Sequence, residues 1–117
     1  MISAKYRFHG HASLKYVFRH GQQARSKFFV IKYIENPRRR YSRLSVVVSK
    51  KIFKSAVKRN RVRRQIYEIS RPFISSSNQA IDAVINIYSP ETLTASHEEL
   101  TLQILPLLRK AGFKQKI

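Results

Sequence analysis

Cysteine is absent from this sequence of 117 residues, which also has only six acidic residues and three glycines. Without cysteine there can be no disulfides or thiolate metal sites, and the composition suits a reducing cytosol. Three glycines leave no glycine-rich phosphate loop. The chain has no apolar run long enough to span a bilayer, and its first residues lack the apolar core of a signal peptide. We therefore expect a cytoplasmic protein that contacts no membrane.

The scarcity of acidic groups also limits the chemistry that the chain can perform. Only Glu98 and Glu99 are adjacent, and a capping box that opens the last helix, Ser96-His-Glu-Glu99, already explains Glu99. Among four histidines, only His9 and His11 are close in sequence, which is a weak metal signal without cysteines or carboxylates nearby. We predict no catalytic residues, no metal site and no small-molecule substrate for the protein alone.

Positive charge is what the chain has in excess. Lysine and arginine number 24 against six acidic residues, for a formal net charge of +18. Residues 1–67 hold 19 of these bases and one acid, whereas residues 68–117 hold five of each. A charge concentrated in one part of a small domain indicates a polyanionic partner. Nucleic acid is the favoured partner, and an acidic membrane surface is a distant second.

Hydrophobic periodicity predicts a single α+β domain over residues 1–117, with the sheet covered mainly on one face. The element order is α-β-β-(β)-α-β-α, where the bracketed strand would be a short one between Gly21 and Phe28. The expected elements are an extended segment over 1–11, a helix over 12–20, strands over 28–34 and 43–49, a helix from Ser55 to Arg71, a strand over 81–88, and a helix from Ser96 to near Leu105. Pro72 and Pro106 are expected to end the two later helices or to kink the last one.

The most informative segment is Lys58-Arg-Asn-Arg-Val-Arg-Arg64. In helical register, Val62, Ile66 and Ile69 share one face. Asn60, Arg64 and Tyr67 then point the opposite way, with Arg61 and Arg63 beside them. Guanidinium groups bind phosphate oxygens in a bidentate manner, and an asparagine can reach a sugar, a base edge or a water-bound metal. The pattern is typical of an RNA-binding helix.

Further cations lie close to this helix in the sequence. Lys50 and Lys51 follow the predicted strand over 43–49, and together with Lys54 they favour an electrostatic cradle where the strand passes into the helix. The run Arg38-Arg39-Arg40 lies in a predicted loop and indicates a sequence-independent phosphate contact without a defined role.

Aromatic residues near the basic segments have two open interpretations, because they can pack in a core or stack on the bases of a single strand. Strand alternation separates Phe29, Ile31 and Tyr33 from Phe28, Val30 and Lys32. Only one set can be core. Lys32 suggests that the Phe28 side is the wetter one.

The order of these motifs resembles the protein component of bacterial ribonuclease P. The resemblance rests on three segments and covers about residues 6–88, with the last helix fitting by length and pattern only. They are Val17-Phe-Arg-His-Gly21, Arg43-Leu-Ser-Val-Val-Val-Ser-Lys-Lys51 and Ala56-Val-Lys-Arg-Asn-Arg-Val-Arg-Arg64. The resemblance implies an α/β sandwich (ribosomal protein S5 domain 2-like) whose left-handed β-α-β crossover carries the basic helix.

The same resemblance implies a subunit that binds a catalytic RNA and the 5′ leader of precursor tRNA. The RNA and its Mg²⁺ ions would hydrolyse the bond that releases the mature tRNA 5′ end. The implied contacts to the catalytic RNA are Lys50, Lys51, Lys54, Lys58, Arg59, Asn60, Arg61, Arg63 and Arg64. A cleft between the first helix and the sheet would take the leader, with Phe18, Arg19, Phe28, Lys32, Tyr33 and Arg43 as its residues.

Three positions depart from the family pattern. Leu14 and Lys32 stand where aromatic residues are common, and Tyr67 stands where a further basic residue is frequent. The alternative function is that of a small basic ribosomal protein with a structural role on ribosomal RNA. Composition does not separate the two functions, since both need a cationic domain on folded RNA. The ordered motifs favour the ribonuclease P protein.

Overall fold

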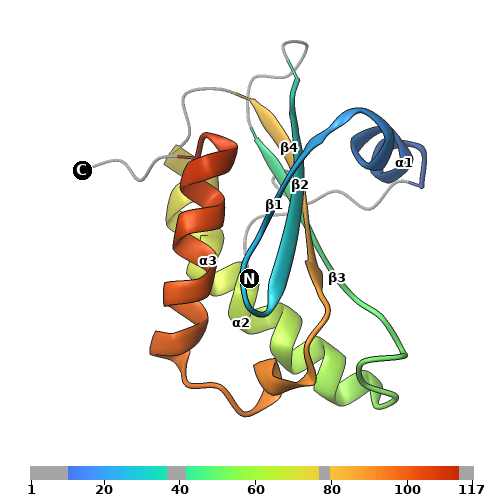
Figure 1. The fold of residues 1–117 in the computed structure, drawn as a ribbon, viewed down its shortest axis with the longest axis vertical. Coiled ribbons are helices and arrows are strands. Elements are labelled where there is room, and N and C mark those ends of the chain that lie inside the picture. Colours follow the sequence, from blue (N-terminus) through green and yellow to red (C-terminus); the bar gives the residue numbers. More distant parts are fainter. Residues whose placement is uncertain (1–10, 37–41, 77–79, 114–117) are drawn as a thin grey trace.

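The computed structural model describes residues 11–36, 42–76 and 80–113 (Figure 1). Their elements are α1 (His11–His20), β1 (Gln22–Arg25), β2 (Phe29–Glu35), β3 (Arg43–Val48), α2 (Ala56–Ser76), β4 (Ile81–Ile87), the short 3-10 helix η2 (Pro90–Leu93) and α3 (His97–Ala111). The predicted order is confirmed, including the short strand after Gly21. The run Arg38–Arg40 and the predicted extended segment up to residue 10 lie outside the described residues, and His11 already belongs to α1.

The described strands form one sheet in the order β1-β2-β4-β3. β2 pairs antiparallel with both β1 and β4, whereas β3 and β4 are parallel neighbours. A parallel pair needs a crossover connection, and α2 provides it. The predicted β-α-β unit that carries the basic helix is therefore present.

Helices lie on both faces of this sheet (Figure 1). α2 and α3 pack against each other and against one face, while α1 packs against β2 and β4 on the other. Strand alternation divides the side chains accordingly. The main core lies on the α2–α3 face and includes Phe29, Ile31 and Ile85, whereas a small cluster around Val17 and Val84 lies under α1.

Two helices run past prolines at which the sequence predicted an end. α2 continues through Pro72 to Ser76, and α3 continues through Pro106 to Ala111. Both prolines are followed directly by core residues, Phe73-Ile74 in α2 and Leu107-Leu108 in α3. Burying these side chains offsets the lost backbone hydrogen bond and the crowding of the proline ring, which cost about 3 kcal/mol in a helix interior.

The starts of these helices agree with the predicted caps. Ser55 Oγ accepts a hydrogen bond from the Lys58 N–H at 3.3 Å, and Ser96 Oγ accepts one from the Glu99 N–H at 3.1 Å. Such contacts satisfy backbone donors that have no partner inside the helix. The sequence signals for both starts are confirmed.

Gly21 connects α1 to β1 where no side chain fits. A Cβ atom at this position would lie 2.5 Å from the Val17 carbonyl oxygen and 2.8 Å from that of Tyr33. Because glycine has no Cβ, its backbone can approach closely enough for the Gly21 N–H to donate to the Val17 carbonyl oxygen at 2.8 Å. This close approach fixes the end of α1 against the sheet, and thereby the position of Phe18 one turn earlier.

Candidate nucleic-acid interface

The inner face of α2 anchors the basic helix in the core. Val62 and Ile66 have no exposed surface, and Ile69 is 8% exposed, so the predicted apolar stripe is confirmed. Asn60, Arg61 and Arg64 are exposed on the other side of the helix. Amphipathic packing thus orients the cations outward, as the periodicity predicted.

Tyr67 does not lie on the cationic face, so this part of the prediction is wrong. Its side chain is 4% exposed, and its hydroxyl accepts a hydrogen bond from the Val46 N–H at 3.1 Å. β3 is an edge strand, and Tyr67 satisfies one of the backbone donors on that edge. The ring belongs to the core, which widens the apolar face of α2.

The turn between β3 and α2 presents two of the predicted lysines. The Ser49 carbonyl oxygen accepts hydrogen bonds from the N–H groups of Ile52 and Phe53, and the Phe53 ring is buried in the main core. Lys50 and Lys51 are exposed at the outside of this turn. An apolar anchor thus holds a cationic loop in place.

Arg59 and Arg63 are half-buried and hold local structure. Arg59 Nη1 donates to the carbonyl oxygens of Phe53 and Lys54, at 2.8 and 2.9 Å. Arg63 Nη1 donates to Asn60 Oδ1 at 2.9 Å. Arg59 therefore braces the turn that carries the lysines, and Arg63 orients the Asn60 amide.

These residues form what we call the cationic α2 surface. Its members are Lys50, Lys51, Lys54, Lys58, Arg59, Asn60, Arg61, Arg63 and Arg64, of which all but Arg59 and Arg63 are exposed. The first turn of α2 contains no acidic residue. Cations at a helix N-terminus oppose the helix dipole, at about 0.3–1 kcal/mol each. This arrangement favours a bound anion, which would stabilise both the side chains and the helix end.

On the opposite face of the sheet, Phe18 and Lys32 come together. Lys32 Nζ lies 4.8 Å from the centre of the Phe18 ring, and the phenylalanine remains 40% exposed. Arg19 is exposed next to Phe18 on α1. We call Phe18, Arg19 and Lys32 the α1–sheet surface. An aromatic ring beside cations can stack with a base while the cations contact phosphates. Leu14 also lies in α1, but its side chain is outside the described part of the chain.

Two aromatic residues predicted for this surface lie elsewhere. Phe28 is 1% exposed in the main core, edge-on to Phe29, so the prediction of a wetter Phe28 side is wrong for this residue. Phe28 precedes β2, and the regular alternation begins only at Phe29. Tyr33 lies on the α2–α3 face, packed against the main core.

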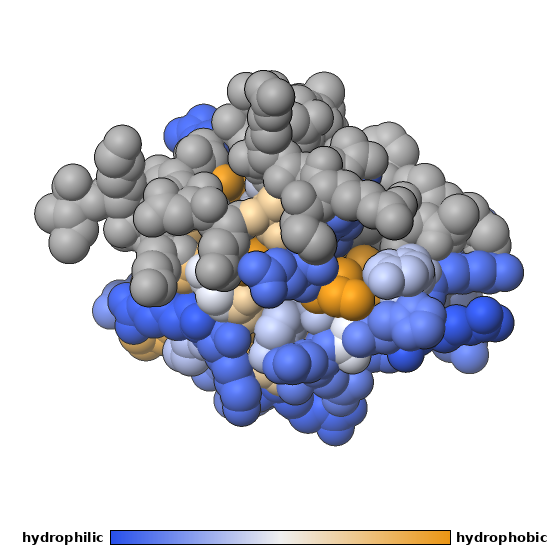
Figure 2. Space-filling model, turned by 90° about the horizontal axis from the view of Figure 1, so that it is seen from above, coloured by the Kyte–Doolittle hydropathy of each residue, from blue (hydrophilic) through white to orange (hydrophobic). Residues whose placement is uncertain are grey.

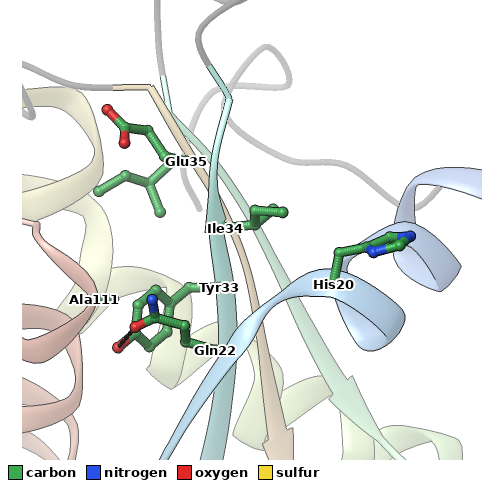
Figure 3. Close-up of a pocket in the computed structure, with 7 residues that line it drawn as sticks. His20, Gln22, Tyr33, Ile34, Glu35 and Ala111 are labelled. Atoms are coloured by element: carbon green, nitrogen blue, oxygen red, sulfur yellow. Dashed lines mark hydrogen bonds between the residues drawn. The ribbon is translucent and has the colours of Figure 1, made fainter.

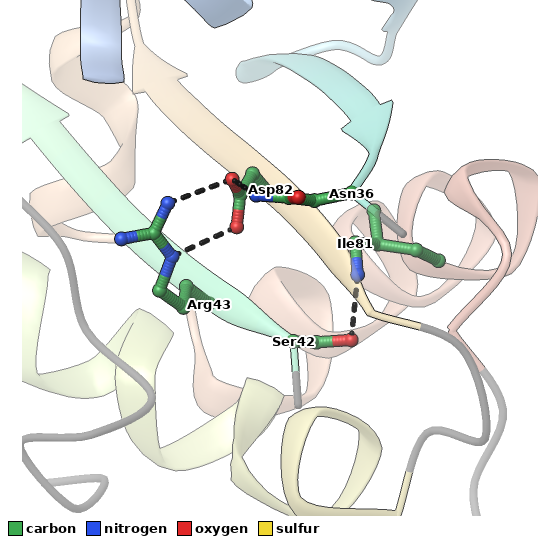
Figure 4. A network of polar contacts seen from close by, with 5 residues as sticks. All are labelled: Asn36, Ser42, Arg43, Ile81 and Asp82. Carbon is green, nitrogen blue, oxygen red and sulfur yellow. Dashed lines mark hydrogen bonds and ion pairs between the residues drawn. The ribbon is translucent and has the colours of Figure 1, made fainter. Parts of the chain in front are cut away.

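Arg43 lies on the α1 side of the sheet, where it forms a partly buried ion pair (Figure 4). Its Nε and Nη2 atoms donate to the two carboxylate oxygens of Asp82 at 2.9 and 2.8 Å. Asn36 Nδ2 donates to the same carboxylate at 2.9 Å. The side chains of Arg43 and Asp82 are only 12% and 7% exposed. Arg43 thus ties β3 to β4, and one edge of its guanidinium is engaged by Asp82.

Tyr33, which the sequence placed in the leader cleft, borders a pocket of about 310 Å³ at the edge of the sheet (Figure 3). The Tyr33 hydroxyl donates to Gln22 Oε1 at 3.2 Å. The Glu35 carboxylate and the His20 imidazole point to opposite sides of β2, so they form no acid–base pair (Figure 3). The full lining is His20, Gln22, Tyr33, Ile34, Glu35, Ile81 and Ala111.

The described surface is predominantly hydrophilic in the view of Figure 2, where hydrophobic residues form only small patches.

Arg25 and Tyr88 lie outside the predicted set of functional residues, although Tyr88 is 39% exposed and Arg25 Cζ lies 5.5 Å from its ring centre. The sequence signal for this pair is strand alternation, which places Tyr88 on the side of Val84 and Asn86.

The described residues contain neither a metal-binding cluster nor a membrane-spanning helix. Within 11–36, 42–76 and 80–113, no group of three or more histidine or acidic residues is arranged to hold a metal ion. No helix in this part of the chain is both long and apolar enough to cross a membrane.

Sequence comparison identifies the family. The family model of ribonuclease P matches residues 2–112. The ribonuclease P protein component of a Geobacillus species is 32% identical over 111 residues, which cover 95% of this chain and 94% of the relative. That of a Pseudanabaena species is 30% identical over 95 residues, which cover 81% of each chain. The alternative of a structural ribosomal protein finds no support in these matches.

Solved structures show the same fold. A mutant of the ribonuclease P protein of Staphylococcus aureus superimposes with a TM-score of 0.82 at 23% identity, over 94% of this chain and 91% of that one. The ribonuclease P protein of Thermotoga maritima superimposes with a TM-score of 0.77 at 23% identity, over 89% and 96%. The chain therefore belongs to the ribonuclease P family and serves as a protein subunit of this tRNA-processing ribonuclease.

Proposed function

We propose that the chain assists a catalytic RNA in removing the 5′ leader from precursor tRNA, and that it binds both RNAs at once. The cationic α2 surface would hold the catalytic RNA, and the α1–sheet surface would hold the leader. Helix α2 and helix α1 cover opposite faces of the sheet, so each surface can be occupied independently (Figure 1).

The observation that carries this proposal is the arrangement of charge around the start of α2. Exposed cations surround a helix N-terminus whose first turn has no acidic residue. The charges repel one another and oppose the helix dipole, so the folded chain gains stability when a polyanion binds there. Guanidinium groups and the amide of Asn60 match the phosphates and sugars of a folded RNA.

The hydrolysis itself is assigned to the RNA and to Mg²⁺ bound mainly by the RNA. The pocket at the sheet edge holds no acid–base pair, and the described residues offer no cluster of metal ligands. What the protein supplies is positive charge between two polyanions. This charge lowers the repulsion between catalytic RNA and precursor tRNA without any new chemistry.

A reconstitution experiment tests this division of labour. Cleavage of a precursor tRNA is measured with the catalytic RNA alone, the protein alone and both together, over a range of Mg²⁺ concentrations. We expect no cleavage by protein alone, and a gain from the protein that is largest near physiological Mg²⁺ and shrinks as Mg²⁺ takes over the screening. Cleavage by RNA-free protein would contradict the proposal.

A second experiment tests the leader contact. Phe18→Leu and Lys32→Gln should weaken binding of precursors with long leaders, by about 1–3 kcal/mol for the lost stacking at Phe18. Binding of mature tRNA should hardly change. Leu102→Ala is the matched control, because Leu102 is 64% exposed on α3, away from both surfaces. If the wild-type complex binds long-leader and leaderless tRNA equally well, the leader contact is wrong.

A further inference from the structure

A second aromatic–cation pair occupies the α1 side of the sheet. Arg25 is exposed on β1, and its Cζ lies 5.5 Å from the centre of the Tyr88 ring. The Tyr88 hydroxyl donates a hydrogen bond to the Ser26 carbonyl oxygen, and the ring is still 39% exposed. The Tyr88 ring is therefore held in place, and both side chains of the pair face solvent.

Strand register places this pair on the same face as Phe18 and Lys32. Arg25 is opposite Val30 on β2, and side chains two residues apart on a strand share a face, so Arg25 lies on the Lys32 side. Tyr88 follows β4, and its N–H donates to the Phe28 carbonyl oxygen at 3.2 Å. This bond continues the β2–β4 register by one residue. The Tyr88 ring is exposed and lies beside Arg25, which places it on the Lys32 side of the sheet and away from the main core.

The register also sets the distance between the two pairs. Arg25 is opposite Val30, two residues before Lys32 on the same strand, and Tyr88 is opposite Phe28, two residues earlier again. The four residues from Lys32 to Phe28 correspond to about 13 Å along the sheet. A few nucleotides of an unpaired strand can bridge this gap. Gln23 is exposed beside Lys32 on the neighbouring strand, where its amide can bond to a base edge or a phosphate.

We propose that Arg25 and Tyr88 form a second stacking platform for the single-stranded RNA that meets Phe18 and Lys32. This inference rests on the proposed leader contact and extends it along the sheet. A guanidinium over an aromatic ring offers its own flat outer face to a base, while its charge attracts the adjoining phosphate. Because the hydrogen bond from Tyr88 to Ser26 fixes the ring in advance, little side-chain entropy is lost when a base binds.

A leader-length series tests the platform in the reconstituted complex of protein and catalytic RNA. Precursor tRNAs whose leaders are shortened one nucleotide at a time are bound to the wild-type complex and to complexes with Tyr88→Leu or Tyr88→Phe. Loss of the aromatic face should raise the Kd for long leaders about five- to hundredfold. Tyr88→Phe keeps the ring and loses only the bond to Ser26, so its Kd should rise much less than that of Tyr88→Leu.

The length dependence separates stacking from a purely structural role. The effects of Tyr88→Leu and Phe18→Leu should each vanish below a certain leader length, and these two lengths should differ by a few nucleotides because the two pairs lie apart along the sheet. Arg25→Gln should lower the salt dependence of long-leader binding by about one ion. Leu102→Ala again serves as the control.

Three outcomes decide between the platform and the leader contact itself. The platform would be overturned if the affinity fell equally at every leader length, or equally in Tyr88→Phe and Tyr88→Leu. Either result would mean that Tyr88 only braces the connection between β1 and β2 through its bond to Ser26. No loss in Tyr88→Leu, with a wild-type affinity that still depends on leader length, would overturn the platform and leave the leader contact standing. A wild-type affinity independent of leader length would overturn both.

Discussion

Replacing Tyr67 by phenylalanine removes one oxygen atom and should destabilise the fold without changing RNA binding. The ring would keep its place in the core, because only the hydroxyl is lost. The Val46 N–H now donates to that hydroxyl at 3.1 Å and is buried. In the variant this donor would have no partner, which costs about 1–3 kcal/mol of unfolding free energy.

The size of the chain converts this cost into a melting shift. An entropy of unfolding of about 2.1 cal/mol/K per residue gives a domain of 117 residues about 0.25 kcal/mol/K. The melting temperature should therefore fall by about 4–12 °C. Urea unfolding in a buffer with a fixed sulfate concentration measures the free energy directly, and the slope against urea should stay constant because the exposed area is unchanged.

Tyr16→Phe is the matched control, since the Tyr16 ring is 57% exposed on α1 and its loss of a hydroxyl should change stability by less than about 0.5 kcal/mol. Affinity for the catalytic RNA should be the same for Tyr67→Phe and wild type at a temperature where both are folded. A variant of unchanged stability that binds RNA more weakly would refute the reasoning and return Tyr67 to the cationic face.

Three further predictions concern charge and packing. Arg61→Ala should weaken binding to the catalytic RNA and flatten the salt dependence of that binding. Val62→Ala should leave the RNA contacts intact and lower the unfolding free energy by about 1–4 kcal/mol. The reverse pattern would mean that α2 faces the other way. Arg43→Ala should cost about 3–5 kcal/mol in urea unfolding, because it leaves the Asp82 carboxylate partly buried without its bidentate partner, and a cost below 1 kcal/mol would contradict the ion pair's structural role. Millimolar polyphosphate should raise the melting temperature in dilute buffer, and an unchanged temperature would contradict a native anion-binding surface.

Features that depend on local sequence were predicted well. The apolar stripe of Val62, Ile66 and Ile69 and the caps at Ser55 and Ser96 are set by residues within one or two helical turns of each other. The resemblance to the ribonuclease P proteins supplied the parallel crossover through α2, which no local pattern contains. Comparison with the family confirmed that resemblance.

The errors arose where distant residues decide the local structure. Pro72 and Pro106 did not end their helices, because core contacts outweigh the local penalty. Sequence spacing also gave no sign of the ion pair between Arg43 and Asp82, which lie 39 residues apart, while the place of Arg43 in the leader cleft stays a prediction. The helical position of Tyr67 predicted a side chain on the cationic face. Its hydroxyl turns inward because it accepts a hydrogen bond from the Val46 N–H on the edge strand β3.

The two surfaces differ in how their positions are fixed, and this difference governs what substitutions can do. The cationic α2 surface is rigid because Phe53 anchors the turn, Arg59 braces it, and Val62 holds the helix. The α1–sheet surface depends on a short helix that reaches the sheet through a small cluster around Val17 and through the close approach at Gly21. Local opening is easiest where few apolar contacts hold an element, so α1 should open at a lower free energy than α2. A leader contact on α1 can then tighten or release while the cationic α2 surface stays bound to its RNA, because the sheet and the main core separate the two.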